Sequence, residues 1–430
     1  MKTLQITDET KNSFLLFLTS LLTAAVGLIS TVVLARIMSI SDYGTYAYTL
    51  SIATLGGVFA SCGTPTVITR EIARCIALND MQSIKGMLIF SNLLVSIGVT
   101  VVGAIILVGH YEFNFYSTSE YSVCLLGSAI LILYLLQLRT IVISTLNGFS
   151  KQMQQAIPAL FGSLFFLLEL SVIKAANLIA APLTVILLQC LSLGIVLLLQ
   201  FNQVQRLALW HKIRTSSAVF RWRKWLQESF KFLGAGVAFT INAQIDIFLL
   251  GTIRGPASVA PYQVGTKAAS VLVIALGALS SVYQPLISKA YFSGDWRDVQ
   301  KKVKSISRAG FISAVLFAAI TVPFRNSIIG TVFGYRYLSA APVLVVLTCA
   351  RLVNASVGAV GPYLGMTEKG GTLLVVLTLE SILNVAGNLV LIPRYGAIGA
   401  AFVTGISMMI VNVGAAIYIY QKFKVNTCFV

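Results

Sequence analysis

The sequence predicts an all-α membrane protein with about twelve transmembrane helices, arranged in two six-helix bundles. Three observations lead to this fold class: the composition, the recurrence of long apolar runs, and a weak internal repeat. Of the 430 residues, 57% are hydrophobic and only 10% are charged, whereas a typical soluble domain carries about 25% charged residues. The mean hydropathy is +0.87. These values exclude an ordinary soluble protein, a disordered chain and a collagen-like fibre.

Apolar runs that are long enough to cross a bilayer recur along the whole chain. A transmembrane helix needs about 20 mostly apolar residues, and the strand-like alternation of an outer-membrane barrel is absent from the sequence. The polar N-terminus lacks a cleavage site of small residues before Phe14, so we expect the first span to be retained rather than removed as a signal peptide. The predicted spans are 14–38, 45–67, 84–108, 121–145, 155–174, 178–201, 230–251, 262–288, 308–332, 340–363, 371–392 and 396–420.

The distribution of basic residues predicts the topology. The net charge of +17 raises nucleic acid as a partner. With a cytoplasmic N-terminus, however, 22 of the 31 Lys and Arg fall in cytoplasmic segments and 5 fall in the opposite loops. The positive-inside rule then places both termini in the cytoplasm. The charge is therefore mainly a topology signal, and we expect no nucleic-acid partner. The four remaining basic residues lie within spans: Arg36, Arg139, Lys267 and Arg351.

A weak repeat at a spacing of 217–219 residues divides the chain into two halves. Tyr43, before the second span, corresponds to Tyr262 at the start of the eighth, and Gly148 corresponds to Gly365. We therefore expect one bundle over residues 1–201 and another over 230–430. Six helices is an even number, so the halves are predicted to be parallel repeats, related by a pseudo-two-fold axis along the membrane normal. Transporters with such repeats place the substrate path between the bundles and work by rocking one against the other.

The segment between the predicted bundles, 202–229, is expected to be a basic amphipathic cytoplasmic linker. Around 216–231 the apolar residues at helical spacing are Val219, Trp222, Trp225, Leu226 and Phe230. The basic residues on the other arc are Arg221, Arg223 and Lys224. This pattern predicts a helix in the headgroup layer. It would either anchor the two bundles at the interface or recruit an anionic lipid substrate.

Three short motifs near the N-terminus carry a family resemblance. They are Ala35-Arg36, Tyr43-Gly44-Thr45-Tyr46 and Arg70-Glu71-Ile72-Ala73-Arg74. Further matches are Leu146-Asn147-Gly148, Gln244-Ile245-Asp246 and Pro285-Leu286-Ile287-Ser288-Lys289. This ordered set resembles the polysaccharide-biosynthesis flippases, the O-antigen transporters of the Wzx type. They belong to the multidrug/oligosaccharidyl-lipid/polysaccharide exporter superfamily.

The resemblance implies a flippase of the bacterial inner membrane. It would move an undecaprenyl-pyrophosphate-linked oligosaccharide from the cytoplasmic to the periplasmic leaflet by alternating access, among membrane lipids and with polysaccharide polymerase and chain-length proteins as candidate partners. A drug/cation antiporter of the same superfamily is the alternative. Such antiporters often carry an acidic residue in helix one, and the first span here has no Asp or Glu. Lipid II flippases usually have fourteen helices rather than twelve.

We expect no enzymatic activity and no cofactor. The loops predicted outside hold no clustered His, Asp or Ser, and the six scattered cysteines form no CxxC pair, so neither a metal site nor a disulfide framework is predicted. A GxxxxGK[ST] motif is absent from the sequence, which argues against ATP hydrolysis by this chain. Energy is expected from the membrane potential acting on an anionic headgroup, or from proton or sodium coupling.

Ionisable residues within spans are the candidate site residues, because charges in a bilayer are expensive to bury. The substrate-path candidates are Arg36, Arg139, Lys267 and Arg351, since guanidinium and ammonium groups suit an anionic pyrophosphate. The ion-coupling candidates are Asp246, Glu169 and Glu380. The candidates at the cytoplasmic interface are Arg70, Arg74, Arg221, Arg223 and Lys224. Asp246 and Lys267 are expected at similar depths in the membrane, and so are Arg351 and Glu380. Each of these couples is predicted to be either a structural ion pair or part of the functional site.

Overall fold

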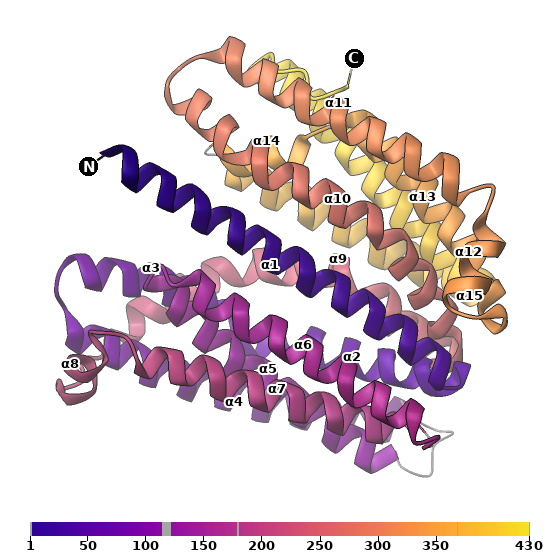
Figure 1. The fold of residues 1–430 in the computed structure, drawn as a ribbon, viewed down its shortest axis with the longest axis horizontal. Coiled ribbons are helices and arrows are strands. Elements are labelled where there is room, and N and C mark those ends of the chain that lie inside the picture. The colour runs from indigo at the N-terminus through magenta and orange to yellow at the C-terminus, as the bar shows by residue number, and fades with distance from the viewer. Residues whose placement is uncertain (1, 114–121, 179, 368, 430) are drawn as a thin grey trace. The chain divides into compact units, whose positions relative to one another are not determined.

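The computed structural model describes residues 2–113, 122–178, 180–367 and 369–429, and over these residues it forms helices and no strands (Figure 1). A bilayer offers no hydrogen-bond partner to backbone N–H and C=O groups, so an apolar segment must satisfy them internally, as a helix does. The predicted all-α membrane fold is confirmed.

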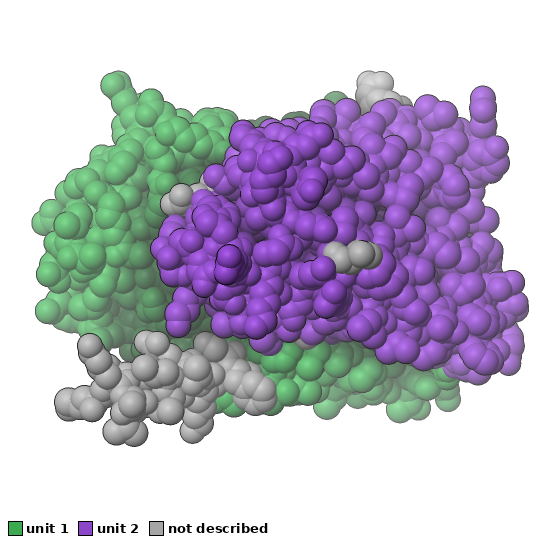
Figure 2. Space-filling model, turned by 90° about the horizontal axis from the view of Figure 1, so that it is seen from above, with its two compact units in different colours: residues 1–38, 48–240 green, residues 39–47, 241–430 purple. Residues whose placement is uncertain are grey.

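The chain divides into two compact units (Figure 2). Unit 1 comprises residues 1–38 and 48–240, and unit 2 comprises residues 39–47 and 241–430. These borders differ from the expected bundles in two places. The change from unit 1 to unit 2 falls inside a helix rather than at residue 230, and the start of the second helix belongs to unit 2. The segment expected to be a linker, 202–229, lies within unit 1.

Unit 1 consists mainly of long, nearly parallel or antiparallel helices, with α1 running beside α6 and α5 beside α7 (Figure 1). Its helices are α1 (Lys2–Ile37), α3 (Thr64–Ala77), α4 (Met81–Phe113), α5 (Ser122–Gly148), α6 (Gln152–Ala175), α7 (Pro182–Gln205) and α8 (Trp210–Thr215). Two more helices are shared between the units, α2 (Ile40–Ser61) and α9 (Trp222–Arg254). Proline occupies the first turn of α3 and of α7, where its missing N–H leaves no intrahelical bond unmade.

Unit 2 packs α13 against α10, α11 and α15. Its elements are η1 (Pro256–Ser258), α10 (Val259–Phe292), α11 (Trp296–Thr321), α12 (Arg325–Val332), η2 (Tyr335–Ala340), α13 (Ala341–Val357), α14 (Val360–Met366) and α15 (Gly370–Phe423). One buried cluster joins α10, α11, α14 and the last turns of α15 around the fully buried ring of Tyr363.

Ten helices of the described chain are long and apolar enough to cross a membrane, and an eleventh crossing is the bent pair α2 and α3. The bend of that pair is 47°. It occurs at Cys62 and Gly63, which both have positive φ angles. This count is lower than the twelve predicted spans because two of them, 371–392 and 396–420, belong to the single element α15.

The helix α15 is a hairpin rather than one crossing. Its 54 residues would extend about 81 Å as a straight helix, against a hydrocarbon core of about 30 Å. At Gly396 the backbone takes φ 54° and ψ −132°, which interrupts the helix. The two halves then pack together, since a Cβ atom on Gly387 would lie 2.8 Å from the side chain of Val403. Counting the halves separately accounts for the twelfth predicted span.

The segment 216–231 does not form a separate surface helix. Residues 217–221 are not helical, and from Trp222 the chain continues without a break through the candidate span α9. Its expected apolar face is also divided. Trp225 is fully buried, whereas Trp222 and Phe230 are exposed. The helical spacing of these residues therefore reflects the first turns of a span, in which one aromatic side chain enters the core of unit 1.

Candidate functional site

The candidate residues of unit 2 come from four different helices. Asp246 lies on α9, Lys267 on α10, Arg351 on α13 and Glu380 on α15. Asp246 is buried, with 4% exposure, and the other three are partly buried. The fold thus places four ionisable groups inside one bundle, from positions as far apart as residues 246 and 380.

The Asp246 carboxylate is held by neutral groups. The Tyr262 hydroxyl donates to Oδ2 at 2.6 Å and the Thr404 hydroxyl lies 2.8 Å from the same oxygen. The side-chain amide of Asn388 donates to Oδ1 at 2.5 Å, and also to the side-chain oxygen of Asn384 at 2.7 Å. The Asn388 side-chain oxygen is buried without a hydrogen-bond partner. Four helical segments therefore converge on one carboxylate with hydroxyl and amide groups only.

The two expected ion pairs of unit 2 are not formed. Among the described residues, neither Lys267 with Asp246 nor Arg351 with Glu380 lies within ion-pair distance. Matching depth along two helices was an insufficient criterion, because it does not fix the direction in which each side chain leaves its helix. One guanidinium nitrogen of Arg351, Nη1, is buried without a hydrogen-bond partner.

The candidates of unit 1 are more dispersed. Arg139 on α5 is partly buried, and its Nε has no hydrogen-bond partner. Glu169 on α6 is buried and accepts a hydrogen bond of 2.7 Å from Ser192 on α7. Its second oxygen is buried and unpartnered. Arg36 lies in the last turn of α1 and is exposed. The structure of unit 1 therefore does not gather these residues into one cluster.

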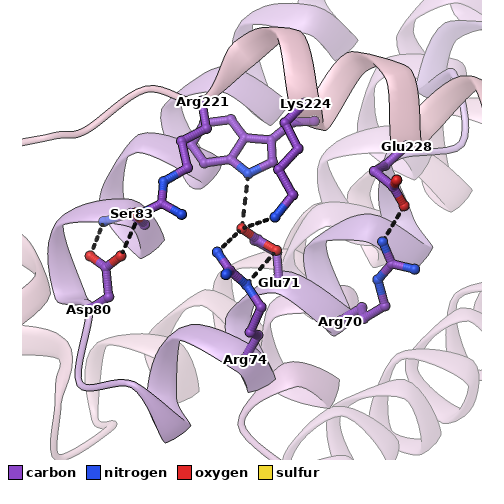
Figure 3. Close-up of polar contacts among 9 residues, drawn as sticks. Arg70, Glu71, Arg74, Asp80, Ser83, Arg221, Lys224 and Glu228 are labelled. Atoms are coloured by element: carbon purple, nitrogen blue, oxygen red, sulfur yellow. Dashed lines mark hydrogen bonds and ion pairs between the residues drawn. The ribbon is translucent and has the colours of Figure 1, made fainter.

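The cationic residues predicted at the cytoplasmic interface form a separate cluster around Glu71 of α3 (Figure 3). Glu71 accepts hydrogen bonds from Arg74 at 2.6 and 3.0 Å and from the Trp225 indole at 3.3 Å. The Lys224 ammonium lies 3.9 Å from the same carboxylate. Glu71 is 5% exposed and Trp225 is fully buried. The first turns of α9 are thus fixed to α3 through one buried carboxylate.

The other interface cations also have acidic or aromatic partners (Figure 3). Arg70 pairs with Glu228, and Arg221 pairs with Asp80 at 3.2 Å. The Arg223 guanidinium lies over the Trp222 ring, 5.2 Å from its centre. These contacts join α3 and the α3–α4 loop to the start of α9. The basic residues therefore make structural contacts within unit 1. The sequence pattern alone did not separate this role from recruitment of an anionic lipid substrate.

Several residues of the site were missed because they are uncharged. Tyr262, Asn384, Asn388 and Thr404 surround Asp246, yet each alone is unremarkable in sequence. The spacing of Asn384 and Asn388 was an available signal, because polar amides at i and i+4 share one face of a helix that is otherwise apolar. In the described chain no group of three or more His, Cys, Asp or Glu side chains is placed to hold a metal ion.

The fold and these polar groups define a multi-pass membrane protein that carries ionisable and amide side chains inside its spans. The polysaccharide biosynthesis protein family matches residues 10–291 of the chain. The chain belongs to this family.

The chain is also similar to a curated relative and to solved structures. A probable low-salt glycan biosynthesis flippase, Agl15 of Haloferax volcanii, is 23% identical over 176 residues. That match covers 41% of this chain and 37% of the relative, so the chain spans little more than a third of it. Among solved structures, an inward-facing multidrug resistance MATE family transporter of the MOP superfamily superimposes with a TM-score of 0.77 at 12% identity, over 94% of each chain.

Two further solved structures share the fold. The lipid II flippase MurJ in an inward closed conformation gives a TM-score of 0.71 at 14% identity, over 96% of this chain and 87% of MurJ. A MOP superfamily transporter from Pyrococcus furiosus gives 0.59 at 13% identity, over 96% and 94%. At these identities the likeness establishes the fold and no more. The expected resemblance to the polysaccharide-biosynthesis family is confirmed by the family match over residues 10–291.

Proposed function

We propose that this protein flips an undecaprenyl-pyrophosphate-linked oligosaccharide, such as an O-antigen repeat unit, from the cytoplasmic to the periplasmic leaflet of a bacterial inner membrane. Both termini would then be cytoplasmic, and transport would proceed by alternating access without catalysis. The family supports a glycan substrate. Polysaccharide polymerase and chain-length proteins are the partners that such a pathway would supply.

The observation that carries this proposal is the presence of incompletely satisfied guanidinium groups inside spans. Buried polar nitrogens normally have hydrogen-bond partners, yet Arg139 and Arg351 each keep a buried nitrogen without one. A pyrophosphate offers several acceptor oxygens and negative charge, which match the planar donors of arginine. A cationic drug would be repelled by the same groups, which favours the flippase over the antiporter.

A complementation experiment tests the proposal. Deletion of the gene should cause lipid-linked repeat units to accumulate on the cytoplasmic face, with loss of surface polysaccharide. Arg139→Glu and Arg351→Glu should fail to restore surface polysaccharide although the proteins reach the membrane. Lys151→Glu, at an exposed position of unit 1, is the control and should complement. Unchanged polysaccharide together with increased drug sensitivity in the deletion strain would instead establish the antiporter.

We further propose that Asp246 is the ion-coupling residue. Its own carboxylate, the two hydroxyls of Tyr262 and Thr404 and the unpartnered amide oxygen of Asn388 provide oxygen ligands of the kind that hard cations prefer. No Lys or Arg of the described chain neutralises it within ion-pair distance. A proton or a sodium ion would compensate its charge. Glu169 and Glu380 are the weaker candidates, since each has a less complete set of polar neighbours.

Reconstituted vesicles separate the energy sources. Flipping of the wild-type protein is measured under an imposed potential, a pH gradient or a sodium gradient, each applied alone. Coupling through Asp246 predicts that one ion gradient accelerates flipping and that Asp246→Asn abolishes this acceleration. Asp298→Asn, a partly exposed acid in the first turn of α11, is the control. Acceleration by potential alone in both proteins would show that the anionic headgroup itself is driven outward, by about 2.3 kcal/mol per charge per 100 mV.

A further inference from the structure

A long apolar groove runs between the two halves of the α15 hairpin in unit 2. Its volume is about 770 Å³. The lining residues of the first half are Gly371, Thr372, Val375, Val376, Leu379, Ile382 and Leu383, and those of the second half are Ile410, Val411, Gly414, Ala415 and Tyr418. Twelve helical residues separate the ends of the first wall, which corresponds to about 18 Å along the axis. The groove therefore has the length and polarity of a hydrocarbon chain.

Small residues create this groove. A Cβ atom placed on Gly371 or on Gly414 would meet no other atom within 4 Å, so the space beside both glycines is open. The walls are formed by Leu379, Ile382 and Ile410, whose side chains are 49%, 58% and 54% exposed. Within a bilayer such open apolar surface is accessible to lipid from the side.

One end of the groove is cationic and aromatic. The Lys422 ammonium donates a hydrogen bond of 2.7 Å to the hydroxyl of Tyr418, a lining residue, and lies 5.8 Å from the centre of the Phe423 ring. The Lys369 ammonium lies over the same ring at 4.7 Å. Lysine and aromatic residues are characteristic of the headgroup level, where ammonium groups reach lipid phosphates.

A second cavity, of about 570 Å³, adjoins Phe423 and extends the cationic end. It is lined by Trp296, Arg297, Gln300, Phe423, Lys424 and Val425. The sequence also places Glu368 beside Lys369, outside the described residues. Positive charge predominates even when that acid is included, because it is outnumbered by four cations: Lys369, Lys422, Lys424 and Arg297. Basic pockets between transmembrane helices are suited to anionic headgroups.

We propose that this groove binds an anionic phospholipid of the surrounding bilayer, with one acyl chain between the halves of α15 and the phosphate beside Lys369 and Lys422. The apolar walls and the cationic end match the two parts of such a molecule. The cations lie at the end of the hairpin and not along the groove, so the headgroup stays at the membrane surface. A resident lipid fits this arrangement better than a transported one, whose headgroup must leave the surface.

Native mass spectrometry of the full chain measures the binding. The detergent-purified protein is titrated with phosphatidylglycerol and, separately, with zwitterionic phosphatidylcholine. Wild-type protein should bind phosphatidylglycerol with clear preference. The double variant Lys369→Gln/Lys422→Gln should bind it roughly thirtyfold more weakly, since each lysine near an anionic lipid contributes about 1 kcal/mol. Gly414→Phe, which fills the groove, should weaken the binding of both lipids.

Two matched controls make the result decisive. The double variant Lys151→Gln/Lys212→Gln removes the same charge at exposed positions of unit 1, which does not contain the groove. Gly127→Phe adds the same ring at another helical glycine whose Cβ direction is open. Both should bind phosphatidylglycerol as the wild type does. Equal affinity of the groove variants and their controls would overturn the proposal. So would a site that takes up undecaprenyl phosphate but not phosphatidylglycerol. Neither outcome bears on flipping, which is measured separately.

Discussion

At the scale of single residues, Glu71 shows how one buried acid can organise the start of a membrane span. Its carboxylate accepts hydrogen bonds from Arg74 on the same helix and from Trp225 on α9, and it pairs with Lys224 on α9. A buried carboxylate is tolerated when it is paired and hydrogen-bonded. The neighbouring pair of Arg70 and Glu228 is more open, with side chains 54% and 21% exposed. These two carboxylates therefore have different energetic importance, although both join α3 to α9.

The substitution Glu71→Gln should lower the free energy of unfolding by about 2 kcal/mol, because Arg74 and Lys224 lose their charged partner next to a buried indole. Thermal unfolding in detergent, followed by tryptophan fluorescence, measures the change. Glu228→Gln is the matched control and should cost clearly less, because the pair of Glu228 with Arg70 is more open to solvent. Equal losses in the two variants would contradict the assigned role of Glu71.

Asp80 gives a pH-dependent contribution to stability. Its carboxylate accepts a hydrogen bond of 3.0 Å from the backbone N–H of Ser83 at the start of α4, and it pairs with Arg221. Hydrogen bonding by Ser83, more than the Arg221 charge, lowers the pKa of Asp80 below its ordinary value. A lowered folded-state pKa stabilises the protein above the ordinary pKa of an aspartate, and this stabilisation is lost as the pH falls through the folded-state value.

Asp80→Ala removes the carboxylate that caps the N-terminus of α4. It should therefore lower the free energy of unfolding at pH 7 by about 1 kcal/mol. The difference between variant and wild type should shrink progressively below pH 4. Melting temperatures of both proteins between pH 3 and pH 7 provide the measurement. Asp298→Ala, at a partly exposed acid in the first turn of α11, serves as the control for general charge effects. A pH-independent difference at Asp80 would show that its charge is not involved.

At the scale of elements, the α15 hairpin depends on how its break at Gly396 is stabilised. The last carbonyls of a helix lack intrahelical partners. Here the Arg254 guanidinium, from the end of α9, donates to the carbonyls of Ile392, Pro393 and Arg394 at 3.3, 2.6 and 3.2 Å. A cation at a helix C-terminus is also favoured by the helix dipole. One side chain thus connects α9 to the turn of the hairpin.

Arg254→Ala should destabilise the protein by about 1–2 kcal/mol, because three carbonyl oxygens lose charge-assisted hydrogen bonds. Hydrogen exchange of the backbone near Gly396 should increase at the same time, which a purely electrostatic effect elsewhere would not produce. Arg394→Ala removes an exposed charge at the same turn and should leave exchange unchanged. Unaltered exchange in Arg254→Ala would show that Arg254 does not stabilise the turn of the hairpin.

At the scale of the whole molecule, the distribution of the basic residues behind the net charge of +17 is the basis of the topology that we propose. The loops that we assign to the cytoplasm hold 22 basic residues, against 5 in the opposite loops. The loop between α6 and α7 is predicted to face the periplasm, and the long loop between α7 and α9 the cytoplasm. Single cysteines in the last turn of α6 and in the short helix α8, between α7 and α9, distinguish the orientations.

In a background with all six native cysteines replaced, Lys174→Cys should react with a membrane-impermeant maleimide in intact cells. Lys212→Cys should react only after the cells are permeabilised. Both positions are exposed, so a lack of labelling reports the side of the membrane and not burial. The reverse pattern would refute the predicted topology, and with it the direction of transport that we propose.

The sequence alone determined the class of fold, because apolar runs of about 20 residues in a chain with few charges permit little else than membrane helices. It also located the intramembrane charges, since each is conspicuous in an apolar run. It also separated the last two spans, which the break at Gly396 divides. It missed the continuity of segment 222–254, because periodicity does not show whether an amphipathic turn extends into a span.

Tertiary structure alone decided which groups meet. It surrounded Asp246 with Tyr262, Asn388 and Thr404 in place of Lys267, and it gave the interface arginines acidic partners from distant parts of the chain. The physical reason is that hydropathy records the transfer of each side chain into lipid, which is a property of single residues. Hydrogen bonds and ion pairs depend on the direction in which a side chain leaves its helix, and packing sets that direction.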